Sequence, residues 1–155
     1  MNSDTRKPVA VIGVGNPLYG DDGFGIAAIE ALRKETLPPG VDLIDGGTLG
    51  VDLLEFLKDY RTVIIIDAAE MGLAPGTVRV FRPDEVRSLK PGHPLSLHHT
   101  DVLGVIELGK TLGETLADIY IVAVEPEVLE MREGLSAHVA VAFSSALREI
   151  RYIAG

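Results

Sequence analysis

The sequence predicts an α/β domain of three layers, in which a mostly parallel five-stranded sheet carries helices on both faces. Short runs of β-branched, apolar residues alternate along the chain with longer segments whose apolar residues recur at helical spacing. Such alternation is typical of parallel strands that are joined by helices. Only the third and fourth predicted strands have no helix between them, so we expect the fourth strand to be antiparallel.

The first half of the chain contains three predicted strands separated by two predicted helices. Residues 9–13 (VAVIG) form an apolar run that ends at glycine, which is typical of a strand buried on both faces. An aspartate in the loop that follows is available to cap the next helix. The predicted elements are a strand at 9–13, a helix at 22–34, a strand at 41–44, a helix around 49–57 and a strand at 62–66.

The second half begins with the turn signal Ala74-Pro75-Gly76. After this turn we predict a strand at 77–81, a helix at 100–112, a strand at 119–124 and a helix at 136–153. Residues 82–97 are rich in proline and polar residues and are predicted to be irregular. Long loops in compact domains are often functional, so this segment is our candidate for contacting a partner.

Length and composition exclude several classes of protein. The 155 residues fit a single domain, 1–155, in which residues 1–7 are expected to be flexible. The absence of cysteine excludes a thiolate nucleophile and cysteine-rich metal sites. A net charge of -9 argues against nucleic acid as a partner. No apolar run reaches the ~20 residues of a membrane helix, so we expect no membrane insertion and a cytoplasmic protein.

The loop after the first predicted strand contains two adjacent acids, Asp21 and Asp22. A dinucleotide-binding loop would read G-x-G-x-x-G, but Leu18 stands in place of the third glycine. Pro17 also removes a backbone donor, and both acids would repel a pyrophosphate. A helix cap would explain one of the two aspartates. The other is therefore a candidate for a functional carboxylate.

Aspartates also end the next two predicted strands, at Asp45 and Asp67. Ligands of open α/β sheets bind outside the carboxyl ends of the strands. If the strands are parallel, Asp22, Asp45 and Asp67 therefore share one rim of the sheet. Each could also be an ordinary turn residue. Together they would repel one another unless a cation, a donor or shared protons offset their charge.

Histidine could complete a metal site at this rim. His98 and His99 stand where the long loop enters a predicted helix, at the same kind of position as Asp22. Two carboxylates and one neutral imidazole suit a divalent metal that keeps open positions. His98 could equally be an ordinary residue at a helix start. His93 and His138 are expected at the surface.

Five motifs follow one another along the chain. They are GVGN at 13–16 with DDGFG at 21–25, then DGGTLG at 45–50, IDA at 66–68, SLH at 96–98 and VEP at 124–126. In this order they make nearly the whole chain resemble the hydrogenase maturation proteases. These endopeptidases remove a C-terminal extension from the large-subunit precursor of nickel-iron hydrogenases.

The resemblance implies that Asp22, Asp67 and His98 coordinate a metal, with His98 chosen over His99 by its place in the SLH motif. It places Asp45 in a motif used close to the cleavage site, so the candidates for catalysis are these three ligands and Asp45. It also implies an enzyme without a permanent cofactor, which recognises nickel already installed in the precursor. Hydrolysis would proceed either with a carboxylate as general base or by metal-polarised attack.

Two other functions fit part of these observations. A non-catalytic metal-sensing or ligand-binding α/β module would bind a cation with the same residues and would cut nothing. A hydrolase resembling the peptidyl-tRNA hydrolases would have a similar sheet, but the net charge of -9 argues against an RNA substrate.

Overall fold

Strands and helices alternate along the chain in the computed structural model, which describes residues 4–47, 49–87, 96–97 and 102–155. The strands are β1 (Lys7–Val14), β2 (Val41–Gly47), β3 (Tyr60–Glu70), β4 (Val78–Phe81), β5 (Ser96–Leu97) and β6 (Asp118–Val124). The helices are α1 (Phe24–Leu32), α2 (Leu53–Asp59), α3 (Pro83–Arg87), α4 (Val102–Thr111) and α5 (Ala137–Ala154), and the short 3-10 helix η1 (Gly20–Gly23) precedes α1. None of the described helices is long and apolar enough to cross a membrane.

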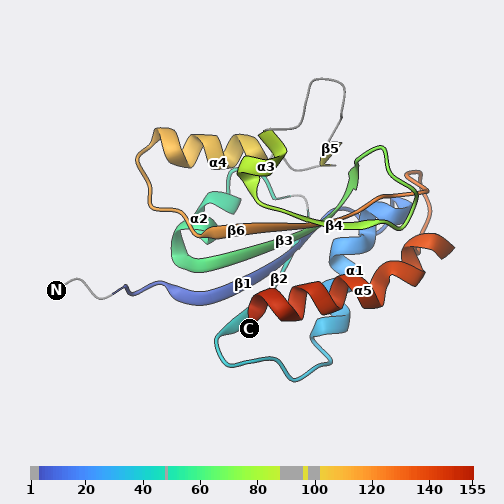
Figure 1. Cartoon of the computed structure of the whole chain (residues 1–155), viewed down its shortest axis with the longest axis horizontal. Coiled ribbons are helices and arrows are strands. Elements are labelled where there is room, and N and C mark those ends of the chain that lie inside the picture. Colours follow the sequence, from blue (N-terminus) through green and yellow to red (C-terminus); the bar gives the residue numbers. More distant parts are fainter. Residues whose placement is uncertain (1–3, 48, 88–95, 98–101) are drawn as a thin grey trace.

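The main sheet has five strands in the order β2-β1-β3-β6-β4 (Figure 1). Neighbouring strands are parallel except for β4, which runs antiparallel to β6. The short β5 pairs with the end of β3 outside this order. The predicted fold class is confirmed, and so is the antiparallel fourth strand. Because no helix returns the chain to the starting edge after β3, β4 runs back along the sheet in the opposite direction.

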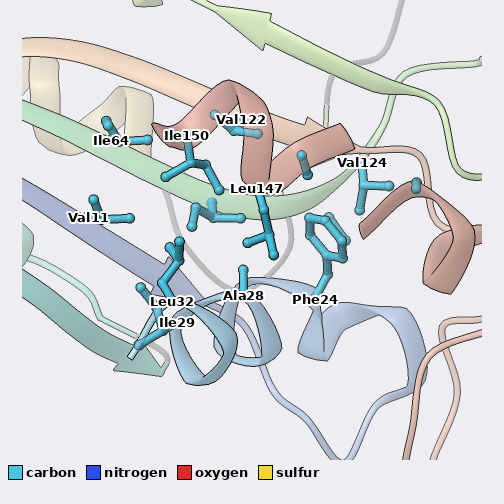
Figure 2. Close-up of a cluster of buried hydrophobic side chains, with 14 of the residues drawn as sticks. Val11, Phe24, Ala28, Ile29, Leu32, Ile64, Val122, Val124, Leu147 and Ile150 are labelled. Atoms are coloured by element: carbon cyan, nitrogen blue, oxygen red, sulfur yellow. The ribbon is translucent and has the colours of Figure 1, made fainter. Parts of the chain in front are cut away.

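Helices cover both faces of this sheet: α1 and α5 pack on one face, and α2 and α4 pack on the other (Figure 1). Figure 2 shows the core on the first face, where Val11, Ile64 and Val122 of the sheet lie under Leu147 and Ile150 of α5. The α1 residues in the same core are Phe24, Ala28, Ile29 and Leu32. With a helix layer on each side, the central strands are buried on both faces, which explains their continuously apolar sequences.

Two glycines allow α1 to lie close to the sheet. A Cβ atom on Gly25 would lie 2.4 Å from the carbonyl oxygen of Ile66 and 2.6 Å from that of Val14. A Cβ atom on Gly13 would lie 2.2 Å from the carbonyl oxygen of Gly25. The start of α1 therefore fits against the ends of β1 and β3 only when both positions are glycine. Gly25 thus provides the close helix packing that a dinucleotide-binding loop obtains from its third glycine.

The observed elements differ from the predicted ones at several ends and within residues 82–97. β3, for example, continues to Glu70 instead of ending at residue 66. α1 begins at Phe24 rather than at Asp22, because η1 occupies the four residues before it. β1 begins earlier than predicted, at Lys7. Residues 82–97 were expected to be irregular but contain α3 and β5, which are too short to produce a periodic pattern in the sequence. Residues 88–95 lie outside the described part of the chain.

Candidate functional site

The strand order places a topological switch point between β1 and β3. From β1 the chain continues to β2 on one side, and it then crosses to β3 on the other side of β1. Ligands of open α/β sheets bind at such a point, outside the carboxyl ends of the strands. Asp22 follows β1 in η1, which packs against β3, and Asp67 lies in the last part of β3. Both side chains are fully buried.

A tight turn after β1 brings Asp22 back toward the end of that strand. Gly15 has a backbone φ angle of 121°, which residues other than glycine rarely adopt. A Cβ atom on Gly15 would also lie 2.0 Å from the backbone oxygen of Asp22. The Asn16 amide donates a hydrogen bond of 2.8 Å to Asp22 Oδ2. Position 15 is therefore glycine because the returning chain passes directly against it.

Asp67 combines deep burial with incomplete hydrogen bonding. Its Oδ1 accepts a hydrogen bond of 2.8 Å from the Ala68 amide, while the buried Oδ2 accepts none from any described residue. Burial raises the pKa of Asp67 well above its ordinary value, and the negative charge of Asp22 raises this pKa further. The Ala68 amide lowers the pKa but does not outweigh the other two causes. Asp67 therefore keeps its proton to a higher pH than an exposed aspartate.

Asp21 bonds to the C-terminal part of the chain rather than to α1. Its carboxylate accepts hydrogen bonds from the amides of Glu127, Val128 and Ser136 and from the Ser136 hydroxyl. The prediction that an aspartate caps α1 is wrong, because the N-cap residue is Gly23 and no side chain forms a cap hydrogen bond there. The 3-10 turn of η1 runs directly into α1 and takes the place of a side-chain cap.

Asp45 lies on the same edge of the sheet but in a different environment. It belongs to β2, where it is paired with Gly13 of β1, and its side chain is exposed. Its Oδ1 accepts a hydrogen bond of 3.2 Å from the Gly47 amide, as expected of a turn residue. The structure therefore brings Asp22 and Asp67 together and leaves Asp45 at the rim, one strand further out.

The predicted histidine ligand, His98, lies outside the described residues, as do His99 and His93. Within the described ranges, no group of three His, Cys, Asp or Glu side chains is placed to hold a metal ion. His138 is exposed on α5 as predicted, with its Nδ1 2.6 Å from Glu127 Oε2. The described part of the site thus consists of two carboxylates, and the imidazole stays a prediction.

A hollow of about 460 Å³, which we call the acidic hollow, opens on the same edge of the sheet as Asp67. It is lined by Glu70, Gly72, Glu125, Pro126, Glu127 and Leu129, from the ends of β3 and β6 and the segments that follow them. Glu125 is 6% exposed, and its Oε1 accepts hydrogen bonds from the Met71 and Leu73 amides. Sequence reasoning noted Glu125 only as part of the VEP motif, because these amides lie in a distant turn.

A second hollow, of about 290 Å³, lies between α3, α4 and the start of β6. Because β6 is parallel to β3, this hollow is at the opposite ends of the strands from Asp67. Of these two hollows, only the acidic hollow therefore lies at the edge of the sheet that carries Asp67.

The arrangement of the two buried acids suits chemistry that involves a cation or a proton. Two carboxylates at one site repel each other, and this cost falls when one is protonated or when a cation binds between them. Two carboxyl groups in different protonation states can also act as acid and base in hydrolysis. The buried Oδ2 of Asp67, which no described donor satisfies, is an oxygen ligand of the kind that divalent metals accept.

Similar sequences belong to proteins of hydrogenase maturation. A family model of hydrogenase maturation proteases (HycI) matches residues 26–152. The chain is 35% identical over 149 residues to the hydrogenase expression/formation protein HoxM of Azotobacter vinelandii, and the match covers 92% of this chain and 72% of that protein. It is 34% identical over 149 residues to the corresponding protein HupD of Rhodobacter capsulatus, covering 92% of this chain and 71% of HupD.

Two similar solved structures are peptidases of hydrogenase maturation. The hydrogenase maturating endopeptidase HybD from Escherichia coli matches with a TM-score of 0.79 and 33% identity, over 92% of this chain and 89% of HybD. The hydrogenase 2 maturation peptidase from a Thaumarchaeota archaeon matches with a TM-score of 0.71 and 29% identity, over 96% of this chain and 99% of that one. The family expected from the five motifs is thus confirmed by sequence and by fold. The chain belongs to the hydrogenase maturation protease family, and it is a peptidase.

Proposed function

We propose that this peptidase removes the C-terminal extension from the large-subunit precursor of a nickel-iron hydrogenase after nickel has been inserted. One observation carries the proposal: Asp22 and Asp67 lie fully buried at the switch point of the sheet in a hydrogenase maturation protease. Burial and the charge of Asp22 raise the pKa of Asp67, and only the Ala68 amide opposes them among the described groups. Such a pair is suited to receive positive charge from a substrate.

Nickel belongs to the substrate in this proposal. The charge of the ion would offset the repulsion between the two acids, and Asp67 would release its proton when the ion binds. Imidazole is a suitable nickel ligand, so His98 of the SLH motif would be the third ligand from the enzyme. Three protein ligands leave positions open for the precursor's own cysteine ligands. The enzyme would therefore engage only a precursor that already carries its metal.

Two routes lead from this site to hydrolysis. In the first, one carboxylate takes a proton from the attacking water, as in aspartic-type proteolysis. In the second, the ion polarises the scissile carbonyl, and the carboxylates mainly hold the ion. A precursor loaded with another divalent metal distinguishes them, because only the second route depends on the Lewis acidity of the ion.

The acidic hollow offers room for the segment that is cut. It opens on the same edge as Asp67, and its acidic side chains match a segment that carries positive charge. β5 pairs with Ala69 and Glu70 and so borders this edge. It is the last part of residues 82–97, the segment that we predicted to contact a partner. We therefore place the precursor's C-terminal segment between β5 and the loop that follows β6.

The test is incubation with a nickel-loaded large-subunit precursor, followed by mass measurement of its C-terminus. We expect a peptide to be released from the nickel-loaded precursor and none from the nickel-free one. Asp22→Asn and Asp67→Asn should each lower the rate at least about 100-fold, which is typical for loss of a general acid or base. Asp118→Asn is the matched control, because this carboxylate is 74% exposed at the start of β6 and should leave the rate unchanged.

Three outcomes would contradict parts of the proposal. If no peptide is released from the nickel-loaded precursor, the proposed function is wrong. Equal cutting of nickel-loaded and nickel-free precursor would exclude nickel recognition. Parental rates in both aspartate variants would exclude Asp22 and Asp67 from the chemistry. A metal-sensing module without activity, the alternative that the sequence left open, would bind the precursor and leave its mass unchanged.

A further inference from the structure

Asp21, the acid next to Asp22, takes no part in the proposed chemistry and is nevertheless fully buried. Its Oδ2 accepts hydrogen bonds of 2.8 Å each from the Glu127 amide, the Val128 amide and the Ser136 hydroxyl. Its Oδ1 accepts a hydrogen bond of 2.7 Å from the Ser136 amide. One carboxylate therefore joins η1 to the loop that follows β6 and to the residue that precedes α5.

Backbone hydrogen bonds hold the same two segments together. The Gly20 amide donates to the Arg132 carbonyl at 2.7 Å, the Asp21 amide to the Val128 carbonyl at 2.8 Å, and the Arg132 amide to the Leu18 carbonyl at 3.0 Å. Gly20 has a φ of 60°, and a Cβ atom there would lie 2.5 Å from the Val128 carbonyl oxygen. The turn of η1 therefore cannot move without disturbing this loop.

We propose that Asp21 is a positioning residue for Asp22, an inference that rests on the proposed function. The two acids are neighbours in one 3-10 turn, but their carboxylates bond to different segments. Asp21 is held by the loop after β6, whereas Asp22 accepts a hydrogen bond from the Asn16 amide next to β1. Holding Asp21 fixes the backbone from which Asp22 reaches Asp67. Because Glu127 also lines the acidic hollow, the same carboxylate holds one wall of the hollow relative to the two acids.

The bonding pattern calls for a carboxylate at position 21. An ionised carboxylate offers about four acceptor positions and no donor, and all four partners of Asp21 are donors. Asparagine would turn an amide group toward donors and leave at least one of them unsatisfied. Asp21→Asn therefore keeps the size of the side chain but weakens the connection between η1 and the loop.

Steady-state cleavage of the nickel-loaded precursor tests this role. We expect Asp21→Asn to lower kcat at least about tenfold and to keep KM within about threefold of the parent, because the change misplaces a reacting group. Ser136→Ala removes one of the four donors and should lower kcat about two- to fivefold. Ile150→Ala controls for lost stability, because Ile150 is a core residue of α5 away from Asp21, and it should leave kcat unchanged while the protein is folded.

A second measurement does not depend on cleavage. In hydrogen exchange, Asp21→Asn should lower the protection of the Asn16 amide about tenfold or more relative to that of Ile64 in β3. Ile150→Ala should leave this ratio unchanged. The proposal is wrong if Asp21→Asn keeps both the parental kcat and the parental ratio, or if Ile150→Ala lowers kcat to the same extent. If the parent releases no peptide while the ratio falls as expected, the proposed function fails and the link from Asp21 to Asp22 stands.

Discussion

Asp22 and Asp67 lie together at the carboxyl ends of β1 and β3, and the negative charge of Asp22 raises the pKa of Asp67. Both side chains are fully buried. Burying two neighbouring acids lowers the stability of a fold when both are ionised, so stability alone does not explain the pair. Departures of this kind are expected at functional sites. The pair therefore leads to predictions for stability as well as for activity.

The free energy of unfolding should fall with rising pH because of Asp67. The pKa of Asp67 in the folded protein is well above the ordinary value of 3.8, so the folded state keeps a proton that the unfolded chain has released. From about pH 4 up to the raised pKa, this one group should lower the free energy of unfolding by up to about 1.4 kcal/mol per pH unit. Below about pH 4 both states bind the proton, and the group adds no slope.

Urea unfolding of the parent and of Asp67→Asn at a series of pH values checks this prediction. The asparagine stays neutral and keeps an oxygen for the Ala68 amide, so the variant should lack the Asp67 slope and gain stability over the parent as the pH rises. Titrating groups that do not interact with Asp67 behave alike in both proteins and cancel in the difference. A difference that does not change with pH would contradict the raised pKa.

Binding of Ni²⁺ alone should release a proton from Asp67. A metal ion binds the ionised carboxylate, so the raised pKa of Asp67 makes proton release part of the binding reaction. Calorimetric titration in two buffers of different ionisation enthalpy should show about one proton released per Ni²⁺ at a pH below that pKa. Asp67→Asn should bind more weakly and release no proton, and Asp118→Asn should behave as the parent. Proton release that persists in Asp67→Asn would assign the proton to another group.

Gly25→Ala should destabilise the protein by about 1–3 kcal/mol, as overpacking does in other cores. The new methyl group would lie 2.4 Å from the Ile66 carbonyl oxygen, so α1 would have to move away from β3. Gly50→Ala is the matched control, because a Cβ atom at Gly50 meets nothing within 4 Å. Thermal unfolding of both variants measures the difference, and equal melting temperatures would exclude the close packing of α1.

Glu125→Ala should destabilise the protein by about 1–3 kcal/mol, because the Met71 and Leu73 amides lose their shared acceptor. The turn after β3 should then become less protected in hydrogen exchange. Glu130→Ala serves as control, because Glu130 is an exposed acid in the same loop. Unchanged protection of the Met71 amide in Glu125→Ala would show that the glutamate does not hold this turn.

The two central carboxylates could be predicted because their placement follows from chain direction. Asp22 follows one strand and Asp67 lies near the end of another, and parallel strands end at the same edge whatever their order. The edge on which Asp45 lies was predictable for the same reason. Its exposure was not, because that depends on β2 being the outer strand of the sheet.

The role of Asp21 could not be predicted from its neighbours in the sequence. Its hydrogen bonds span 106 to 115 residues, whereas a local interpretation sees only a helix that begins nearby. One indication was present in the sequence: a helix cap explains only one of the adjacent acids Asp21 and Asp22, so the other needs a second role.

Short elements and close contacts also escaped prediction. α3 has five residues and β5 has two, so neither completes a period that the sequence could reveal. β5 exists because it pairs with Ala69 and Glu70, a contact that depends on the folded sheet. His98 lies outside the described residues, and its role stays a prediction from the SLH motif.

The hydrogen bonds of Asp21 also determine when the site can be completed during synthesis. Asp22 and Asp67 both precede β4, so β1 and β3 can pair while the rest of the chain is still being made. The partners of Asp21 lie at residues 127–136 and leave the ribosome only after β6. A nascent chain thus carries Asp22 and Asp67 early but lacks the loop after β6 that holds η1. The peptidase site can therefore be assembled only after translation has passed β6.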